Sequence, residues 1–406
     1  MEIRIIKNAP GVVYEDVSEE IVLQVTEGKN SMGELISKRY ELFFVNSNQK
    51  EEIEPEIPKY HLWDIISLSR PKTYIYFTSC AMKDKGRMEV KLYRYSWEQK
   101  EAELVYTTMD DLFLYPEQKK TMVFVLDENY LLLQNMYLKT NGTETYQEFF
   151  DFELMLYSIK EQKSFLVTDQ YLLQAGISFM GPVEKNICAI KTGYNLLRNN
   201  GFHYLNSTEM VVENIGFVNI KQMISDILLK QKNIYIDIID QVKGDKTIPF
   251  CKVEKGYLIY SRVSKEGSEE VIFYHYEDKE VNACIFPNVH KIEDLSRPCL
   301  LKGMPCILLE NKKGAQLYNL KKEKKEFVFG NDTQVKEILQ DLIVVETRHK
   351  RKLLKNAYYT VDVYQYSDHT MLVNEKGNFG AAIASTIFTD AASAIKENIV
   401  LYLFIK

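Results

Sequence analysis

A short segment of the sequence is densely basic. Five consecutive residues carry guanidinium, imidazole or ammonium groups, and Lys355 follows shortly after them; the five are Arg348, His349, Lys350, Arg351 and Lys352. Cationic groups at this density bind phosphate or other polyanions. The cluster has no interleaved aromatic residues of the kind that nucleic-acid stacking needs. An ordinary solvated loop is therefore the alternative to polyanion binding.

A second segment combines aromatic, imidazole and carboxylate side chains. It reads Tyr60-His61-Leu62-Trp63-Asp64. An indole and a phenol beside an imidazole and a carboxylate are typical of platforms that bind sugars or peptides. The alternative is that the large aromatic side chains pack inside the protein, as most of them do. Tyr60, His61, Trp63 and Asp64 are therefore candidate ligand-binding residues.

An apolar stripe at helical spacing interrupts the middle of the chain. It consists of Ile220, Met223, Ile224, Ile227 and Leu228. This spacing predicts an amphipathic helix over 219–233, with Asn219 as its amino-terminal cap. The functional interpretation is a helix that docks a partner. The alternative is a helix whose apolar stripe packs on its own domain.

Signals for catalysis or metal binding are sparse. The six histidines and six cysteines are spread singly, and no two cysteines have the spacing of a zinc site. Residues 176–180 begin like a nucleophile elbow but end in Met instead of Gly. The sequence has no phosphate loop, dinucleotide fingerprint or HExxH motif. We expect neither a metal nor a cofactor, and the sequence identifies no catalytic residue.

The elements that must position these residues follow a repeated strand pattern. Apolar residues alternate along a short run, an aromatic residue falls within it, and a polar turn follows. Alternation with period two and many tyrosines is typical of a strand with one face more buried than the other. Six copies occupy residues 40–45, 90–95, 154–159, 271–276, 315–320 and 361–366.

Each copy is preceded by a uniformly apolar strand and followed by a tight turn and a short strand, which predicts a repeat of four antiparallel strands. A degenerate copy is expected between 176 and 246. In this repeated hairpin the chain resembles β-propeller proteins, although it matches no named blade signature. The resemblance implies an all-β propeller of four-stranded antiparallel blades, about seven in number with six or eight possible, and a helical insertion near 219–233.

The two ends of the sequence bear on the domain count. Residues 1–6 and 398–406 are both strand-like, and pairing them in one blade would remove two exposed edges. We therefore expect one propeller domain over 1–406, with an irregular or helical insertion at 200–235. A two-sheet sandwich is the alternative. Short helical turns are predicted at 332–340 and 390–396.

Composition narrows the class of partner. The sequence has 51 Lys and Arg residues and 57 Asp and Glu residues, which gives a net charge of -6. A protein dedicated to nucleic-acid binding is expected to be strongly basic, so this class is excluded. No run is long and apolar enough for a membrane span or a secretory signal. We expect a cytoplasmic monomer with free thiols, and neither a membrane nor a nucleic acid as its partner.

The predicted connections between second and third strands are long, whereas those between third and fourth strands are tight. Long loops on a rigid scaffold are where binding residues tend to lie. We therefore expect a non-catalytic scaffold that binds a protein or peptide through the long-loop face. One alternative is a glycan-acting hydrolase or lyase with its site at the central channel of the propeller. A second alternative is polyanion binding through 348–355.

Overall fold

A computed structural model describes most of the chain. The described residues are 3–8, 12–16, 21–29, 35–44, 47, 49–53, 63–64, 74–83, 86–111, 119–140, 148–168, 176–193, 212–243, 246–264, 266–286, 295–311, 314–339, 341–349, 358–376, 378–384, 387–390 and 400–405. They divide into two compact units. Unit 1 comprises Met1–Glu56 and His290–Lys406, and unit 2 comprises Ile57–Val289.

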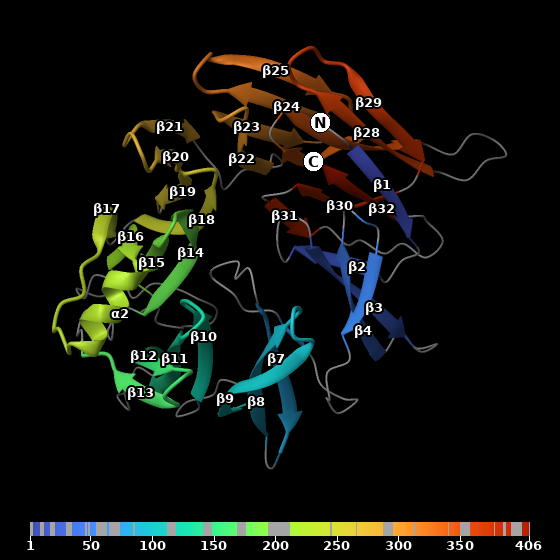
Figure 1. Ribbon diagram of the computed structural model, residues 1–406. Helices are drawn as coiled ribbons and strands as arrows, with labels where there is room; N and C mark the ends of the chain where they lie inside the picture. The colour runs from blue at the N-terminus through green and yellow to red at the C-terminus, as the bar shows by residue number, and fades with distance from the viewer. Residues whose placement is uncertain are drawn as a thin grey trace. The chain divides into compact units, whose positions relative to one another are not determined.

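Unit 2 holds four sheets, each of four antiparallel strands in sequence order (Figure 1). The first two are β6 (Trp63–Asp64), β7 (Tyr74–Met82), β8 (Arg87–Ser96) and β9 (Glu101–Asp111), then β10 (Lys119–Val125), β11 (Tyr130–Thr140), β12 (Glu148–Ser158) and β13 (Lys163–Leu166). The other two are β14 (Ile177–Glu184), β15 (Ile187–Thr192), β16 (Val212–Asn219) and β17 (Asp237–Lys243), then β18 (Lys246–Glu254), β19 (Tyr257–Ser264), β20 (Glu269–His275) and β21 (Val281–Phe286).

Unit 1 also holds four sheets of four strands. Three of them are antiparallel and run in sequence order: β2 (Val12–Asp16), β3 (Ile21–Lys29), β4 (Leu35–Phe44) and β5 (Gln49–Ile53); β22 (Leu295–Leu301), β23 (Met304–Asn311), β24 (Gly314–Asn319) and β25 (Lys324–Phe329); β26 (Thr333–Leu339), β27 (Leu342–His349), β28 (Tyr358–Gln365) and β29 (Met371–Lys376). The last is β1 (Ile3–Asn8), β32 (Val400–Ile405), β30 (Asn378–Ala384) and β31 (Ile387–Asp390), in that order.

This fourth sheet of unit 1 joins segments from the two ends of the sequence. β1 pairs antiparallel with β32, with Ile3 opposite Ile405, and β32 runs parallel to β30. The other seven sheets are antiparallel throughout. The predicted single domain over 1–406 stays a prediction, because each unit is compact by itself.

The prediction of an all-β fold of four-stranded antiparallel blades is confirmed. Every one of the six repeated sequence patterns falls in the third strand of a sheet, namely β4, β8, β12, β20, β24 or β28. The degenerate copy expected between 176 and 246 is the sheet β14–β17. The fold is of the β-propeller type, and the predicted count of about seven blades fits the seven wholly antiparallel sheets.

The predicted helical insertion is also confirmed, as helix α2 (Ile220–Leu228) between β16 and β17. Asn219 caps it, since its Oδ1 atom accepts a hydrogen bond from the backbone N–H of Gln222 at 3.1 Å. The apolar stripe faces inward. Ile220, Met223, Ile224 and Ile227 are buried in a core shared with β11, β12, β14 and β15, and Leu228 is partly buried against it.

The helical turn predicted at 332–340 is wrong, because this segment contains strand β26. A β-bulge between Val335 and Glu337 shifts the register of β26 against β27. The bulge inserts one extra residue, so Val335 and Ile338, three positions apart, both reach the core of the sheet pair β22–β25 and β26–β29. Of the turn predicted at 390–396, all but residue 390, the last residue of β31, lies outside the described residues.

Neighbouring sheets within each unit are joined by a recurring hydrogen bond. A side-chain oxygen of one sheet accepts a hydrogen bond from a backbone N–H of the next sheet. The donor lies in the first strand of that sheet, which is an edge strand whose outward N–H groups have no neighbouring strand to pair with. The donor–acceptor pairs are Thr121 N to Asp110 Oδ2 at 3.0 Å, Ile177 N to Gln134 Oε1 at 2.8 Å, Ile248 N to Glu213 Oε2 at 2.6 Å and Val335 N to Glu310 Oε1 at 3.1 Å. We call these bonds the edge ties.

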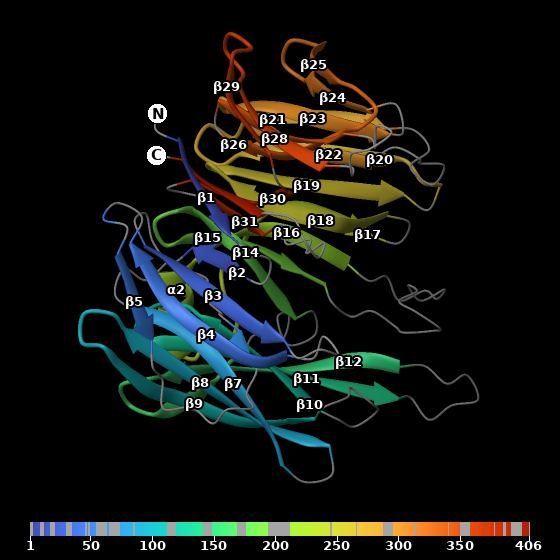
Figure 2. The ribbon, with the colours of Figure 1, turned by 90° about the vertical axis from the view of Figure 1, so that its right-hand side faces the viewer.

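Apolar side chains fill the space between the tied sheets. β14–β17 and β18–β21 lie next to each other in Figures 1 and 2 and share one core, which includes Ile215, Phe217, Leu258 and Ile272. The edge ties place a fixed polar contact at the border of such a core. Neighbouring sheets are therefore held together by both apolar packing and a directed hydrogen bond.

Candidate functional site

One face of the sheet β26–β29 is polar at the end where β27 connects to β28. Residues directly opposite each other in an antiparallel pair lie on the same face. His349 is opposite Tyr358, Thr347 is opposite both Thr333 and Thr360, Thr360 is opposite Lys376, and Asp362 is opposite Asn374. We call this set the polar column: Thr333, Thr347, His349, Tyr358, Thr360, Asp362, Asn374 and Lys376.

The upper part of the polar column is an aromatic and cationic stack. The rings of His349 and Tyr358 lie 4.5 Å apart at an interplanar angle of 14°. The Lys376 ammonium lies over the Tyr358 ring, 5.1 Å from its centroid. His349 is fixed from the other side, since its Nε2 atom is 2.9 Å from the Thr360 hydroxyl. Tyr358 remains 37% exposed, so part of this residue is still in contact with solvent.

The lower part of the polar column holds one buried carboxyl group. Asp362 accepts a hydrogen bond from the Asn374 amide. Burial raises the pKa of Asp362, while the Asn374 hydrogen bond and the nearby His349 act in the opposite direction. The raised pKa means that ionising this carboxyl group costs more free energy than ionising an exposed aspartic acid. Further down the same face, Tyr364 packs on the apolar core.

The polar column can bind an anionic group. It offers an ammonium at Lys376, an imidazole at His349 and hydroxyl groups at three threonines, all on one sheet face. Its carboxylate, Asp362, is buried at the bottom. Hydrogen bonds from cationic donors to carboxylate or phosphate oxygens are the strong ones in proteins. The column is therefore suited to a carboxylate or phosphate ligand.

The predicted basic cluster starts at this column. Arg348 is exposed and His349 half-buried at the end of β27, and the backbone N–H of Arg348 donates to Asp332 O at 2.8 Å. Lys350, Arg351 and Lys352 lie outside the described residues. The sequence nevertheless places them directly after His349, which is itself a member of the polar column. The column and the basic segment therefore belong to one hairpin.

The other predicted site residues lie elsewhere. Trp63 and Asp64 form β6 and pair with Ser79 and Thr78, and Tyr60 and His61 lie outside the described residues. The five residues predicted as a partner helix, Ile220, Met223, Ile224, Ile227 and Leu228, pack on the core of unit 2. The structure thus gives these five side chains a packing role.

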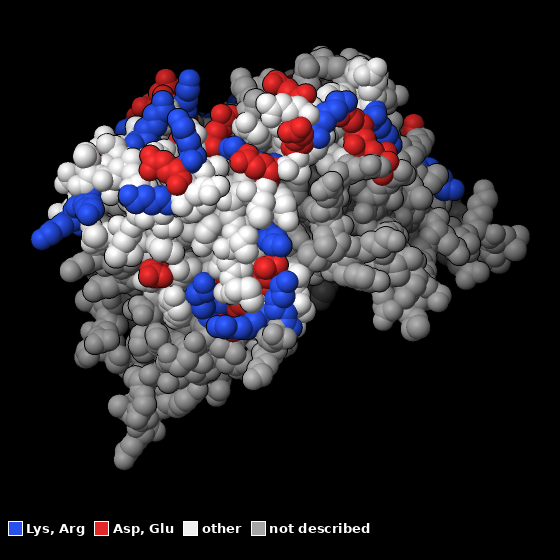
Figure 3. Space-filling model, turned by 60° about the horizontal axis from the view of Figure 1, so that its bottom comes forward, with Lys and Arg blue, Asp and Glu red and all other residues white. Residues whose placement is uncertain are grey.

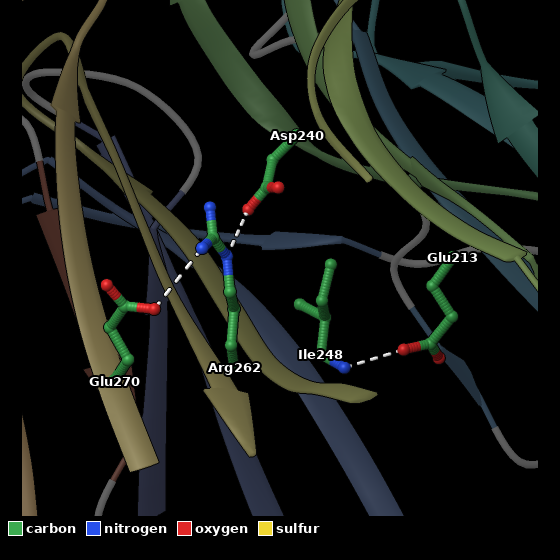
Figure 4. Close-up of polar contacts among 5 residues, drawn as sticks. All are labelled: Glu213, Asp240, Ile248, Arg262 and Glu270. Carbon is green, nitrogen blue, oxygen red and sulfur yellow. Dashed lines mark hydrogen bonds and ion pairs between the residues drawn. The ribbon is translucent and has the colours of Figure 1, made fainter. Parts of the chain in front are cut away.

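A second polar cluster, in unit 2, is a closed network. Arg262 bridges two carboxylates, with Nε 2.6 Å from Asp240 Oδ2 and Nη1 3.2 Å from Glu270 Oε2 (Figure 4). Burial and the neighbouring Asp240 raise the pKa of Tyr260 strongly, although Arg262 opposes this. The guanidinium is occupied by its own sheet pair, so this cluster serves to hold β17 against β19 and β20.

Three of the described cysteines are shielded from reaction by burial. Burial raises the pKa of Cys188 to about 11 and those of Cys251 and Cys306 to about 12, so these thiols stay protonated and poorly nucleophilic.

Among the described residues, no three His, Cys, Asp or Glu side chains are grouped to hold a metal ion. Within the same residues, no helix has the length and apolar character to cross a membrane. Lys, Arg, Asp and Glu lie interspersed on the described surface in Figure 3.

Sequence reasoning located the basic segment but missed the column beside it. The column residues come from four strands and are separated by up to 43 positions, from Thr333 to Lys376. No single strand contains more than three of them. One usable signal exists: Tyr358, Thr360 and Asp362 place polar side chains at every second position shortly after the basic segment.

No protein-family model and no curated protein matches this sequence. Dipeptidyl peptidase 4 of Porphyromonas gingivalis is similar in structure, with a TM-score of 0.50 and 10% identity over 88% of this chain and 51% of that chain. A prolyl endopeptidase gives 0.45 and 10%, over 99% and 53%. The β-propeller domain of the Trilobed protease from Pyrococcus furiosus gives 0.43 and 9%, over 89% and 98%. The chain spans about half the length of the first two, and at such identity the similarity extends to the fold alone.

Proposed function

We propose that this protein is a non-catalytic propeller scaffold that binds an acidic protein or peptide segment at the β27–β28 hairpin. The observation that carries the proposal is the polar column, in which Lys376, His349 and Tyr358 are stacked at the root of the basic segment. An acidic side chain of the partner would meet the Lys376 ammonium and the threonine hydroxyls. The basic residues of the loop would supply further charge.

Four physical features support this partner class. The protein has a net charge of -6, so a densely basic hairpin is a local exception that attracts anionic groups selectively. Tyr358 is exposed and held in place by His349, and a fixed aromatic ring loses little entropy on binding. A peptide carboxylate also suits paired cationic donors. The hairpin lies on the long-loop end of its sheet, where binding residues tend to be placed.

The test is binding of a fluorescein-labelled 15-residue peptide rich in Glu and Asp, followed by fluorescence anisotropy at low and high salt. A triple alanine variant at Arg348, Arg351 and Lys352 should weaken binding at least tenfold, and salt should weaken binding to the wild type. The matched control removes three lysines from the hairpin of β24 and β25, at the opposite end of a neighbouring sheet; Lys321 lies in its turn, and Lys324 and Lys325 begin β25.

The control variant should bind as the wild type does. The same peptide with Gln and Asn in place of Glu and Asp should not bind. Equal loss in both triple variants would mean that net charge alone attracts the peptide, and the proposed site would be wrong. Tighter binding of a single-stranded oligonucleotide than of the acidic peptide would replace the proposal with a nucleic-acid partner.

A further inference from the structure

Three aromatic rings surround one ammonium group at the turn between β20 and β21. The Nζ atom of Lys279 lies over the rings of Tyr276, Tyr274 and Phe217, at 4.3, 5.8 and 6.0 Å from their centroids. The Phe217 ring is 4.8 Å from Tyr276, edge to face, and 5.7 Å from Tyr274. We call these three rings the aromatic cage.

The rings of the aromatic cage are held in place from below. Phe217 belongs to the core between β14–β17 and β18–β21 and is only 2% exposed. Tyr274 and Tyr276 are partly buried against the same core. The backbone N–H of Tyr276 also donates to Gly256 O at 2.9 Å. The aromatic cage is therefore preorganised, so ligand binding does not have to supply the free energy needed to order its rings.

The occupant of the cage is less firmly held. Lys279 is exposed and sits in a tight turn with φ 60°. The turn is closed by local bonds that do not involve the lysine side chain: His275 N donates to Glu280 O at 2.8 Å and Glu280 N donates to Asp278 Oδ1 at 2.9 Å. The Lys279 side chain can thus leave the cage while the turn keeps its shape.

The chemistry of the cage favours a cation with little hydration. Ring faces attract positive charge, and a quaternary ammonium gives up less hydration than a lysine ammonium does when it enters such a site. The turn also carries three carboxylates, Glu277, Asp278 and Glu280, close in sequence to Lys279. A cationic ligand that displaced Lys279 would therefore enter an acidic surrounding.

We propose that Phe217, Tyr274 and Tyr276 form a binding site for a trimethylammonium group, and that Lys279 is an internal occupant which such a ligand displaces. The site is in unit 2 and is independent of the polar column in unit 1. Two sources share this chemistry, namely a trimethylated lysine in a peptide and a choline compound. The experiment includes both.

The test uses the full chain with 13C-labelled tyrosine and phenylalanine, titrated with choline and followed by NMR of the ring signals. Lys279→Ser empties the cage, so choline should bind this variant at least tenfold more tightly than the wild type. Lys163→Ser is the matched control, because Lys163 lies over a single ring, that of Phe165, at 5.2 Å. It should bind choline as the wild type does.

Further variants and ligands distinguish cation binding in the aromatic cage from non-specific binding of apolar groups. In the Lys279→Ser background, Tyr276→Leu should abolish binding and Tyr276→Phe should retain it. The neutral isostere 3,3-dimethyl-1-butanol should not bind, because it lacks the charge. A trimethyl-lysine peptide that binds more tightly than choline assigns the site to proteins, and the reverse order assigns it to choline compounds. Absence of binding to Lys279→Ser, or equal binding of the isostere, would overturn the proposal.

Discussion

Lys191 and Glu213 together hold both backbone polar atoms of a single residue, Ile248. The Lys191 ammonium donates to Ile248 O at 2.6 Å, and Glu213 Oε2 accepts from Ile248 N at 2.6 Å. Lys191 and Glu213 also pair with each other, at 3.1 Å. Their side chains are only 14% and 5% exposed. An ion pair of the sheet β14–β17 thus fixes the first strand of the sheet β18–β21.

The first prediction concerns this ion pair. Glu213→Gln should lower the free energy of unfolding by about 3 kcal/mol, because it replaces a charged partner of the buried Lys191 ammonium with a neutral one. Urea unfolding followed by circular dichroism measures the change. The control is Glu103→Gln, which breaks the ion pair of the 57% exposed Glu103 with Arg94 and should cost less than about 1 kcal/mol. Similar losses in both variants would contradict a special role for the Glu213 tie.

A second prediction contrasts a buried position in helix α2 with an exposed position directly after it. Ile224→Asp should destabilise the protein by at least about 3 kcal/mol, since it places a carboxylate in an apolar core. Leu229→Asp follows directly after the helix at a position that is 68% exposed, and it should change stability by no more than about 0.5 kcal/mol. Thermal unfolding of both variants is the measurement. A stable Ile224→Asp protein would show that the stripe is not needed for the core.

The third prediction is a pH dependence set by Asp362. Its pKa is raised above the ordinary 3.8 by burial, so the folded protein binds this proton more tightly than the unfolded chain does. Stability from this group is therefore greatest at low pH and falls as the pH rises from about 3.8 through the raised pKa. Asp362→Asn removes the titration but keeps the oxygen that accepts from Asn374.

The measurement for Asp362 is urea unfolding of the wild type and of Asp362→Asn between pH 3.5 and 7. The variant should gain stability relative to the wild type as the pH rises over this window. Two curves that run parallel would mean that the carboxyl group titrates alike in folded and unfolded chains.

A fourth prediction orders the cysteines by reactivity. Burial raises the pKa of Cys306 to about 12, and Cys306 is fully buried on β23. Cys284 is half-buried on β21, an outer strand of its sheet, with a smaller rise in pKa. Alkylation by iodoacetamide at pH 8, read by peptide mass spectrometry, should therefore modify Cys284 well before Cys306. After urea unfolding the two should react at similar rates, and equal rates in the folded protein would contradict the order.

The repeat of the fold was readable from the sequence because it depends on short-range alternation. The run from Tyr40 to Val45 and its five counterparts each alternate within a single strand, and each is a third strand in the structure. The error at 332–340 has a physical cause. The bulge in β26 brings Val335 and Ile338 to one face at a spacing of three, which is also the spacing of a helix.

The polar column and the edge ties were not predictable in the same way, because each brings together residues from strands distant in sequence. Gln134 and Ile177 are 43 positions apart. The sequence holds a weak signal for the edge ties. Gln134 directly follows the run Leu131-Leu132-Leu133, and Glu310 directly follows Ile307-Leu308-Leu309. A polar residue directly after an apolar run within a strand can therefore mark a buried acceptor that needs a donor.

The pairing of β1 with β32 has a consequence for synthesis on the ribosome. Ile3 and Ile405 are neighbours in one sheet, although nearly the whole chain separates them. All strands of unit 2 precede residue 290 in the sequence, whereas this sheet of unit 1 cannot be completed until β32 has been made. Such a late, long-range pairing is slow to form. Until translation passes residue 405, β1 lacks its partner strand, and its backbone N–H and C=O groups are open to pairing with other strands.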